Sequence, residues 1–496
     1  MSSKEFLAID LGAESGRGVL GSFDGNRVTF SEVGRFATGA NAVAHPDGTV
    51  RWDIDGIFRE VEGIVDKAVA AQTVDGIGID SWGVDFGLID KSNALIAPPV
   101  CYRDRSHGEA RDRMLTRIAA VDIWDATGIQ GMPFNTLYQV AAIAARSPEQ
   151  LDMADRLLLI PDLIAHRLSA GAHRSVEVTN GSTTQMMTPG GSAWNIDLLT
   201  RAGLPFHFLS PTVTSSTRIG DVNLPLSSGR GLGGRSVPIY APGTHDTASA
   251  VAAVPVAGDK SWAFLSSGTW SLLGYELRSP ILSHDAMRAG FSNEAGVDGT
   301  TRFLKNIMGL WLVQECRRVM GGTYSYAELT QLAADAPAGS LIDATDNRFL
   351  NPPDMVEEIR QACLDTGQTP PSSPGQIVRC CLESLALAYR RSIRQLETLL
   401  GRKIEVLHII GGGSNNTVLN QWTADACGIP VVSGPAEATA LGNILAQMIG
   451  AGVLSNWQEA RAVSRASSNV YEFAPNSELQ ADWAKREENI VDLWNH

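Results

Sequence analysis

Apolar residues recur along the chain in two different spacings, and the pattern switches between strand and helix several times. Residues 6–10 are a short, nearly continuous apolar run, which predicts a buried strand. Residues 19–23 and 28–36 flank Asp24-Gly25-Asn26, a turn sequence that predicts a hairpin. Asp53 then precedes a segment with helical apolar spacing, which predicts a capped helix with one face inward. The apolar positions of this helix are Ile54, Ile57, Phe58, Val61, Ile64 and Val65.

A second block of the chain repeats part of this organisation. Residues 77–79 and 84–89 are further apolar runs, so the first block is expected to be a mixed sheet with helices rather than a strict β-α-β series. In residues 262–274 a strand, a Ser/Gly turn and another strand follow one another, as they do in residues 7–19. This weak internal repeat predicts an α/β chain with two related lobes. Residues 211–236 are rich in Ser, Gly and Pro, and are predicted to cross between the lobes.

Two patterns near the C-terminal half add to this prediction. An apolar strand over residues 406–410 leads into Gly411-Gly-Gly413 and then into a helix. Residues 304–314 are apolar at helical spacing, which predicts a core helix. Asn306 and Gln314 are its polar exceptions, and we expect them to point into a cleft.

Charge and cysteine content narrow the possible classes of function. The chain of 496 residues is long enough for two or three domains. Its formal net charge of −14 disfavours nucleic acid and anionic membrane surfaces, and leaves a phosphate site dependent on backbone amides and a metal ion. No membrane span or signal peptide is expected. The six cysteines form no Cys-x-x-Cys pair, which predicts reduced thiols, a cytoplasmic location and no zinc site.

Three small-residue turns are candidate nucleotide contacts. The turn after Asp10 would leave backbone N–H groups pointing outward as an anion cradle, and Asp10 could hold Mg²⁺ through water. In the turn at residues 265–271, Thr269 could bind a phosphate oxygen. Gly411 to Gly413 would let an adenosine approach closely, although the segment is neither a dinucleotide fingerprint nor a P-loop. Taken singly, the turn after Asp10 is equally well explained as an ordinary hairpin, and Gly411 to Gly413 as a crowded helix–strand junction. The turn at residues 265–271, taken alone, is better explained as an ordinary hairpin.

Two other segments carry candidate catalytic chemistry. Asp246 lies at a loop-to-helix transition in Gly243-Thr-His-Asp-Thr247, where a carboxylate is exposed and oriented; the alternative is that it only caps the helix that follows. Residues 79–86 combine Asp80 and Asp85 with Trp82, whose ring could stack on the C–H groups of a sugar. The alternative for this segment is a turn with a buried Trp82.

Taken in order, these motifs resemble known phosphotransfer proteins. Asp10-Leu-Gly12, Ser267-Gly-Thr269 and Gly411-Gly-Gly413 resemble the two phosphate motifs and the adenosine motif of the actin, hexokinase and heat-shock ATPase superfamily. Over essentially its whole length the chain resembles the FGGY family of carbohydrate kinases. The segments that carry this likeness are residues 78–86, 102–104, 133–139, 179–180, 182–185, 245–250, 266–271, 304–311 and 426–428.

The resemblance implies an α/β fold of two ribonuclease-H-like lobes of the actin/hexokinase type, with the active site in a cleft between them. It implies a sugar- and phosphate-binding lobe over residues 1–240 and a nucleotide-binding lobe over 241–496 that begins with the catalytic loop. The implied activity is Mg²⁺-assisted transfer of phosphate from ATP to O1 of L-rhamnulose. Other ketoses or polyols (fuculose, xylulose, ribulose, glycerol) stay open as substrates, as does a non-catalytic nucleotide-binding regulator. A monomer and a homodimer are both compatible with the sequence.

The resemblance also assigns roles to individual residues. Asp246 is expected to accept the proton of the sugar hydroxyl. The residues expected to contact the sugar are Trp82, Gly83, His245, Asp246 and Thr247. Those expected to contact the nucleotide are Ala13, Glu14, Ser15, Gly16, Arg17, Thr269, Asn306, Gln314 and Gly412, with Asp10 at the metal.

Two positions depart from the family pattern. Glu14 stands where a small hydroxyl residue is expected, and its carboxylate would repel a triphosphate unless it turns away or faces Mg²⁺. Among the cysteines, the resemblance leaves Cys363 and Cys380 as one possible pair, whereas Thr423 stands where a partner of Cys427 would be.

Overall fold

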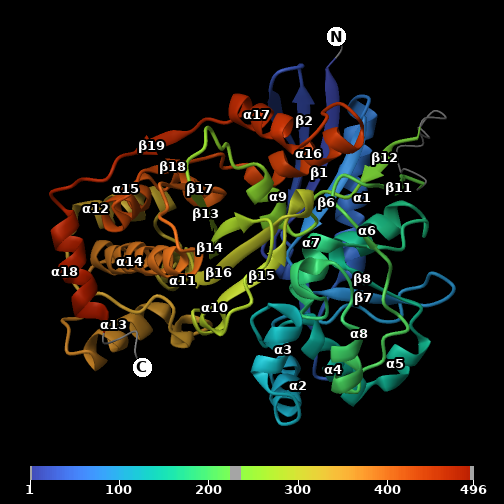
Figure 1. The fold of residues 1–496 in the computed structure, drawn as a ribbon, viewed down its shortest axis with the longest axis horizontal. Helices are drawn as coiled ribbons and strands as arrows, with labels where there is room; N and C mark the ends of the chain where they lie inside the picture. Colours follow the sequence, from blue (N-terminus) through green and yellow to red (C-terminus); the bar gives the residue numbers. More distant parts are fainter. Residues whose placement is uncertain (1–2, 224–235, 492–496) are drawn as a thin grey trace. The chain divides into compact units, whose positions relative to one another are not determined.

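The computed structural model describes residues 3–223 and 236–491 (Figure 1). The chain forms two compact units, each assembled from separate segments of the sequence. The first consists of Met1–Pro255, Glu276–Phe303 and Ala438–Ser467, and the second of Val256–Tyr275, Leu304–Glu437 and Ser468–His496. The two functional lobes expected from the sequence meet at a single boundary between residues 240 and 241, and they do not coincide with these compact units.

A six-stranded mixed sheet is the centre of the first unit. Its strand order is β11-β12-β6-β1-β2-β3, with β1 antiparallel to β2 and parallel to β6. The bounds are β1 Lys4–Leu11, β2 Gly16–Phe23, β3 Val28–Phe36, β6 Gly76–Ser81, β11 Arg218–Asp221 and β12 Pro238–Tyr240. The predicted mixed sheet and the predicted hairpin are therefore confirmed.

Helices of the first unit cover this sheet and bury its apolar residues. Helix α1 (Ile54–Ala71) begins at Asp53, whose side chain accepts a hydrogen bond from the Gly56 N–H, as the sequence predicted. Its apolar face joins a core that includes Leu7, Ile9 and Ile79. The other helices of the unit are α2 Ser106–Leu115, α3 Ala120–Thr127, α4 Thr136–Arg146, α5 Pro148–Met153, α6 Ile160–Leu168, α7 Val178–Gly181, α8 Ile196–Ala202, α9 Asp246–Ala252, α10 His284–Arg288, α16 Ala438–Gly450 and α17 Trp457–Ser467. Its shorter strands are β4 Ala42–Ala44, β5 Val50–Trp52, β7 Phe86–Ile89, β8 Arg156–Leu159, β9 Val176–Glu177, β10 Thr212–Val213 and β15 Phe291–Ala295.

Helix α16 joins the first unit although it comes from the C-terminal part of the chain. It packs against α9, β1 and β6. Gln447 donates to the Leu7 carbonyl, and Asn443 donates to Asp80. A side chain at Gly442 would come within 1.8 Å of the Ser249 carbonyl oxygen, so glycine is required for α16 to lie this close to α9.

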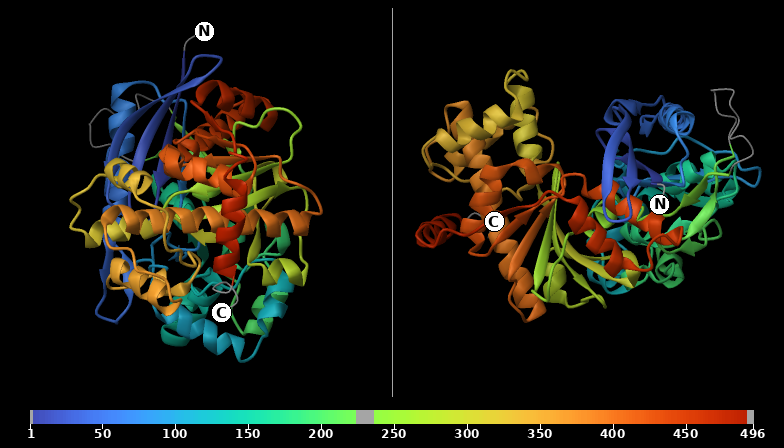
Figure 2. Two further views of the ribbon diagram at one scale, coloured as in Figure 1. Left: turned by 90° about the vertical axis from the view of Figure 1, so that its left-hand side faces the viewer. Right: turned by 90° about the horizontal axis from the view of Figure 1, so that it is seen from above.

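A second sheet, of seven strands, has the order β15-β16-β14-β13-β17-β18-β19. Its further strands are β13 Trp262–Ser267, β14 Trp270–Leu277, β16 Thr301–Met308, β17 Val406–Ile410, β18 Val431–Ser433 and β19 Tyr471–Phe473. The helices of the second unit are α11 Trp311–Val319, α12 Tyr326–Asp335, α13 Met355–Asp365, α14 Pro374–Leu400, α15 Thr417–Cys427 and α18 Gln480–Val491. Helix α14 begins with a capping box between Ser373 and Gln376, and α12 and α15 pack against it; it can be followed in both views of Figure 2.

Three details differ from the sequence prediction. The predicted helix over 304–314 is instead the second half of β16 followed by the start of α11. Leu304, Ile307, Met308 and Trp311 have helical spacing along the sequence although they belong to two different elements. The strand predicted over residues 19–23 begins earlier, at Gly16, so the turn after Asp10 is shorter than expected. Residues 211–223 do not cross between units but add β11 to the first sheet, while residues 224–235 lie outside the described residues.

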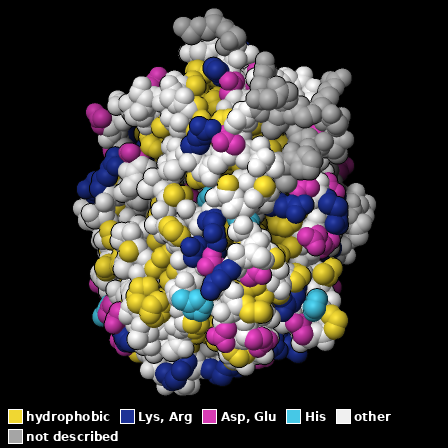
Figure 3. All heavy atoms as spheres, turned by 90° about the vertical axis from the view of Figure 1, so that its right-hand side faces the viewer, with side chains coloured by type: hydrophobic (Ala, Val, Ile, Leu, Met, Phe, Trp, Pro, Cys, Tyr) yellow, Lys and Arg dark blue, Asp and Glu magenta, His cyan; other side chains and the backbone are white. Residues whose placement is uncertain are grey.

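The surface is mixed in charge, and the cysteines are unpaired. Figure 3 shows basic and acidic side chains interspersed over the described part of one face. Within residues 3–223 and 236–491, no helix is long and apolar enough to cross a membrane. All six cysteines are free thiols, and Cys363 and Cys380 lie within hydrogen-bonding reach of each other.

Candidate active site

The catalytic candidate Asp246 is the first residue of α9, directly after the loop that follows β12. A carboxylate at this position is stabilised by the free N–H groups and the dipole of the helix start. Its Oδ1 accepts hydrogen bonds from the backbone N–H and the hydroxyl of Thr247. The side chain is 30% exposed, so it is oriented by the loop yet open to a ligand. Partial burial, together with the charge of Asp10, raises the pKa of Asp246 above its usual value, although His245 opposes this.

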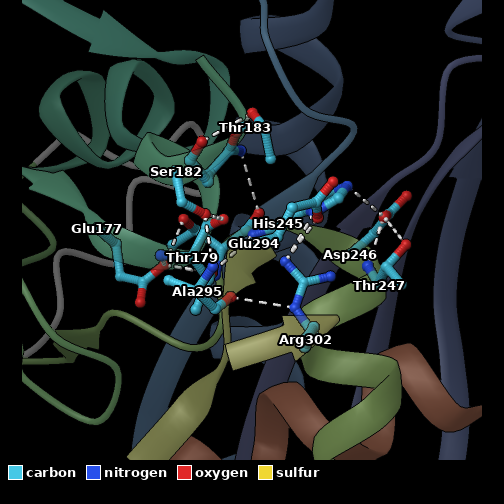
Figure 4. Close-up of polar contacts among 12 residues, drawn as sticks. Glu177, Thr179, Ser182, Thr183, His245, Asp246, Thr247, Glu294, Ala295 and Arg302 are labelled. Atoms are coloured by element: carbon cyan, nitrogen blue, oxygen red, sulfur yellow. Dashed lines mark hydrogen bonds and ion pairs between the residues drawn. The ribbon is translucent and has the colours of Figure 1, made fainter. Parts of the chain in front are cut away.

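The neighbouring His245 imidazole is held by charged residues of two strands (Figure 4). Its Nε2 lies 3.5 Å from Asp246 Oδ1. On the other side of the ring, Nδ1 lies 3.1 Å from Arg302 Nη2 and 3.2 Å from Glu294 Oε2. Glu294 comes from β15 and Arg302 from β16, and the two form a buried ion pair of 3.0 Å.

A second buried carboxylate, Glu177 at the end of β9, anchors the same loop. Its Oε2 accepts from the Thr244 N–H at 3.1 Å and the Thr244 hydroxyl at 2.9 Å. It also accepts from the Thr179 N–H at 2.9 Å, and Thr179 in turn accepts from the His245 N–H at 3.3 Å. Burial raises the pKa of Glu177 to about 7. The loop is thus fixed by its backbone as well as by its side chains.

Two more carboxylates face each other on the first sheet. Asp10 of β1 and Asp80 of β6 are partners in the parallel register. Arg17 donates to Asp10 Oδ2 from both Nε (3.0 Å) and Nη2 (2.9 Å). Asp80 Oδ2 accepts from Asn443, and its buried Oδ1 has no partner among the described residues. Burial and the charge of Asp10 raise the pKa of Asp80 well above its usual value.

The predicted phosphate loop lies between β1 and β2. Gly12 N–H donates to the Ser15 carbonyl, which closes a tight turn around Ala13 and Glu14. The Glu14 carboxylate is paired with Arg103 at 2.7 Å, so its charge is offset by a cation. Gly16 and Arg17 belong to β2, and Arg17 directs its guanidinium at Asp10.

The residues around Trp82 form a packed corner. The Trp82 ring is buried against Trp52, with ring centroids 4.6 Å apart. Its Nε1 donates to Asp85, which also accepts from Trp52 Nε1 and from Gln139. The geometry therefore supports the buried interpretation of this tryptophan more than a ring open to a ligand.

Gly83, the other predicted sugar contact of this corner, has little free space. A side chain at Gly83 would come within 3.0 Å of Thr183, and the next residue, Val84, has a φ of 71°. A β-branched residue rarely adopts this left-handed conformation, so the backbone here is held in place by its surroundings. The Val84 carbonyl accepts from the Thr136 hydroxyl at 2.6 Å.

The second unit brings two of the predicted nucleotide turns together. β13 and β17 are parallel neighbours, so the turns that follow them meet at one edge of the sheet. Gly411 has a φ of 82°, and a side chain at Gly413 would come within 2.1 Å of Ser267 Oγ. A side chain at Gly412 would meet nothing within 4 Å, so this glycine borders open space.

The remaining nucleotide candidates lie on elements next to these turns. The Thr269 carbonyl accepts from the Gly309 and Trp311 N–H groups, and thus ties the β13–β14 turn to the start of α11. Gln314 lies on α11 and Asn306 on β16, and both are partly exposed.

Sequence reasoning missed Glu177, Glu294 and Arg302. Each is a charged residue in a strand that the structure largely buries, and such a residue must find a partner. That signal was available, but the partners come from distant parts of the sequence and could not be named without the fold.

Comparison with known proteins defines the class. The model of the FGGY family of carbohydrate kinases, N-terminal domain, matches residues 6–253, and that of the C-terminal domain matches residues 263–451. The chain belongs to the FGGY family of carbohydrate kinases and is a carbohydrate kinase.

Individual relatives indicate which kind of carbohydrate kinase the chain resembles. The chain is 42% identical to a rhamnulokinase of Bacteroides thetaiotaomicron, over 90% of this chain and 91% of the relative. It is 41% identical to a rhamnulokinase of Yersinia pestis, over 96% and 97%.

Solved structures of low sequence identity share the fold. A ligand-bound xylulose kinase from Lactobacillus acidophilus matches with a TM-score of 0.79 at 15% identity, over 99% of this chain and 98% of that one. Plasmodium falciparum glycerol kinase with ADP matches with a TM-score of 0.75 at 16% identity, over 100% and 97%. The two-domain α/β kinase fold predicted from the sequence is confirmed.

Proposed function

We propose that this chain transfers the γ-phosphoryl group of ATP to O1 of L-rhamnulose, and releases L-rhamnulose 1-phosphate and ADP. The observation that carries the choice of sugar is the 40–42% identity to rhamnulokinases over at least 90% of the chain. Identity at this level over nearly the full length supports the same substrate, although specificity finally resides in the side chains that line the pocket.

The chemistry rests on Asp246. In the proposed step, a lone pair of the sugar O1 attacks the γ-phosphorus, the bond to the β–γ bridging oxygen breaks, and ADP carries away that electron pair. The O1 proton passes to an oxygen of the Asp246 carboxylate. A carboxylate with a raised pKa is suited to this task, because it is a stronger base than an ordinary aspartate.

Asp246 is preferred over the two other aspartates near the loop. Asp85 is surrounded by donors: Trp52, Trp82, Tyr102 and Gln139 all donate to it. Asp80 is fully buried, with one oxygen bound to Asn443. Only Asp246 combines partial exposure with a fixed orientation at a helix start.

The carboxylates of the first sheet fit a hydrated Mg²⁺. The Asp10–Asp80 pair concentrates negative charge, and Asp80 Oδ1 lacks a partner among the described residues. Mg²⁺ keeps most of its waters when it binds a protein, so one or two carboxylates can be enough to hold it. Bound beside Asp10, with Asp80 as a further acceptor, Mg²⁺ would neutralise charge on the phosphates.

The nucleotide is expected to bind the two turns of the second unit, with contacts from Thr269, Asn306, Gln314 and Gly412. The turn at Ala13 to Ser15, together with Gly16 and Arg17, is expected to contact the phosphates through backbone N–H groups. Pairing with Arg103 reduces the repulsion that Glu14 would otherwise exert. The proposed sugar contacts are His245, Thr247, Gly83 and Trp82, although the Trp82 ring is buried. The same proposal includes the functional division between residues 240 and 241 and a cytoplasmic location. It also includes a monomer or homodimer that binds neither nucleic acid nor membranes.

A coupled assay of ADP release tests this function. With ATP and Mg²⁺, the panel is L-rhamnulose, L-fuculose, L- and D-xylulose, L- and D-ribulose and glycerol. We expect the highest kcat/KM with L-rhamnulose and a 1-phosphate product, identified by phosphorus NMR. A clear preference for another panel member would support the kinase activity but show that L-rhamnulose is not the substrate. No sugar-dependent ADP release with any of them would instead support a nucleotide-binding regulator.

A further inference from the structure

The buried ion pair of Arg302 and Glu294, next to His245, is expected to add little to the stability of the fold. Arg302 is 1% exposed and Glu294 is 9% exposed, and removing two charges from water costs about as much as their attraction returns. Arg302 Nε donates to the Ala295 carbonyl at 3.0 Å, which fixes the direction of the guanidinium. Its Nη2 then lies between Glu294 and the imidazole of His245 (Figure 4).

The direction of the hydrogen bond between Arg302 and His245 follows from the chemistry of arginine. A guanidinium carries only donors, so in the 3.1 Å contact Arg302 Nη2 donates and His245 Nδ1 accepts. Glu294 Oε2 lies 3.2 Å from the same Nδ1, but it is nearer to the guanidinium, at 3.0 Å, and is paired with that charge. The single proton of the neutral imidazole is then on Nε2, and Nε2 is the nitrogen that lies 3.5 Å from Asp246 Oδ1. Glu294 lies 3.0 Å from the same Nη2 and keeps the guanidinium in this place.

We propose that Glu294 and Arg302 are positioning residues for the phosphoryl transfer: Arg302, held by Glu294, fixes the His245 tautomer whose Nε2–H faces the Asp246 carboxylate. This inference rests on the proposed function, since it assigns a role through Asp246 as the base. The Nε2–H dipole stabilises the ionised carboxylate and limits its rotation, so that a lone pair remains directed at the sugar hydroxyl.

Other charged residues also lie near His245, Asp246 and Arg302. Asp10 and Asp80 add negative charge near Asp246, and Glu177 adds negative charge near Arg302. Burial would raise the pKa of Glu294, but Arg302 and His245 together outweigh burial and keep the pKa below its usual value, so Glu294 is ionised at neutral pH. His245 lowers the pKa of Asp246 against burial and Asp10, and so do the two hydrogen bonds from Thr247.

The experiment compares three variants with the full-length protein. Glu294→Gln with Arg302→Met removes both charges and therefore leaves no buried charge without a partner. Arg302→Lys keeps a cationic donor at the position. The matched control is Glu276→Gln with Arg461→Met, which removes another largely buried ion pair of the same unit, with a distance of 2.7 Å.

The readouts are the tautomer of His245 and the pH profile. Nitrogen-15 NMR of histidine-labelled protein, with the His245 signals assigned from His245→Gln, reports which ring nitrogen carries the proton. We expect Nε2–H in the wild type, the control and Arg302→Lys, and its loss in Glu294→Gln/Arg302→Met. In that double variant kcat should fall about a hundredfold, with the KM for ATP unchanged. The acidic limb of its kcat profile should move up by about one pH unit, because Asp246 loses a partner of its ionised form.

Each outcome separates the inference from the proposed function. A proton on Nδ1 of wild-type His245 overturns the inference, even if the double variant fails to fold. A double variant with the wild-type acidic limb, while Asp246→Asn is inactive, overturns it as well. If Asp246→Asn keeps wild-type turnover, the proposed base is wrong, whereas the tautomer measurement still judges the role of Arg302.

Discussion

At the scale of single residues, the site is a set of carboxylates whose surroundings give them different tasks. Asp85 accepts four hydrogen bonds, and Glu177 holds a backbone loop. Asp10 is paired with Arg17, and Asp246 alone is partly exposed at a helix start. Chemically identical groups thus become structural, charge-bearing or basic according to burial and partners.

Replacement of Asp246 by Asn should abolish most of the turnover. The amide keeps the size of the side chain but cannot take up the sugar proton, and loss of a general base costs about two to four orders of magnitude in kcat. The KM for ATP should stay within about twofold, since the Asp246 side chain is the proposed base for the sugar proton and is not among the expected nucleotide contacts. Initial rates of ADP release measure both quantities. Turnover close to that of the wild type would transfer the role of the base to Asp80 or Asp85.

Glu177 should make the stability of the protein depend on pH. Its pKa is about 7 in the folded protein and 4.5 when exposed, so the folded state binds the proton more tightly. The free energy of unfolding should therefore fall as the pH rises from about 4.5 to about 7, by about 3 kcal/mol from this group. The difference between the wild type and Glu177→Gln in urea unfolding isolates this contribution from Asp80 and Asp85. A constant difference across this pH range would show that Glu177 does not titrate there.

At the scale of elements, adjacent glycines of one turn serve different purposes. Gly413 has no room for a side chain because of Ser267, whereas Gly412 borders open space. Gly413→Ala should thus lower the free energy of unfolding by about 1–3 kcal/mol through overpacking. Gly412→Ala should leave stability unchanged and raise the KM for ATP by about tenfold, the effect of one methyl group that intrudes on a ligand. Thermal unfolding and ATP titrations of both variants check this. An unchanged KM for ATP in Gly412→Ala would remove Gly412 from the nucleotide site.

Most elements could be predicted from the sequence because local patterns determine them. The Asp24-Gly25 hairpin, the Asp53 cap and the strand before Gly411 depend on residues that are close in sequence, and each is found in the structure. The segment 304–314 could not be assigned, because its apolar residues have helical spacing although they belong to a strand and a helix. In the site, Asp246 was visible as a loop carboxylate, but the contact of Arg302 with His245 joins residues 57 positions apart.

At the scale of the whole molecule, the family division and the compact units disagree at α16. The N-terminal family model ends at residue 253, yet the first unit also needs Glu276–Phe303 and Ala438–Ser467. These late segments supply Glu294 and Arg302 behind the catalytic loop, and Asn443 beside Asp80. The site residues of the first unit are therefore complete only when the chain has been made almost to its end.

A fragment of residues 1–255 should accordingly fail to fold as an independent domain, although it spans the whole N-terminal family model. Without α16 it loses the helix that packs against β1 and β6, and the Leu7 carbonyl and Asp80 lose Gln447 and Asn443 as donors. Apolar area exposed on the sheet costs about 25 cal/mol per Å², and domains are only marginally stable. Circular dichroism during urea titration should show no cooperative transition for the fragment. Adding residues 276–303 and 438–467 through flexible linkers should restore one, and a cooperative transition for 1–255 alone would show that α16 is dispensable for the first sheet.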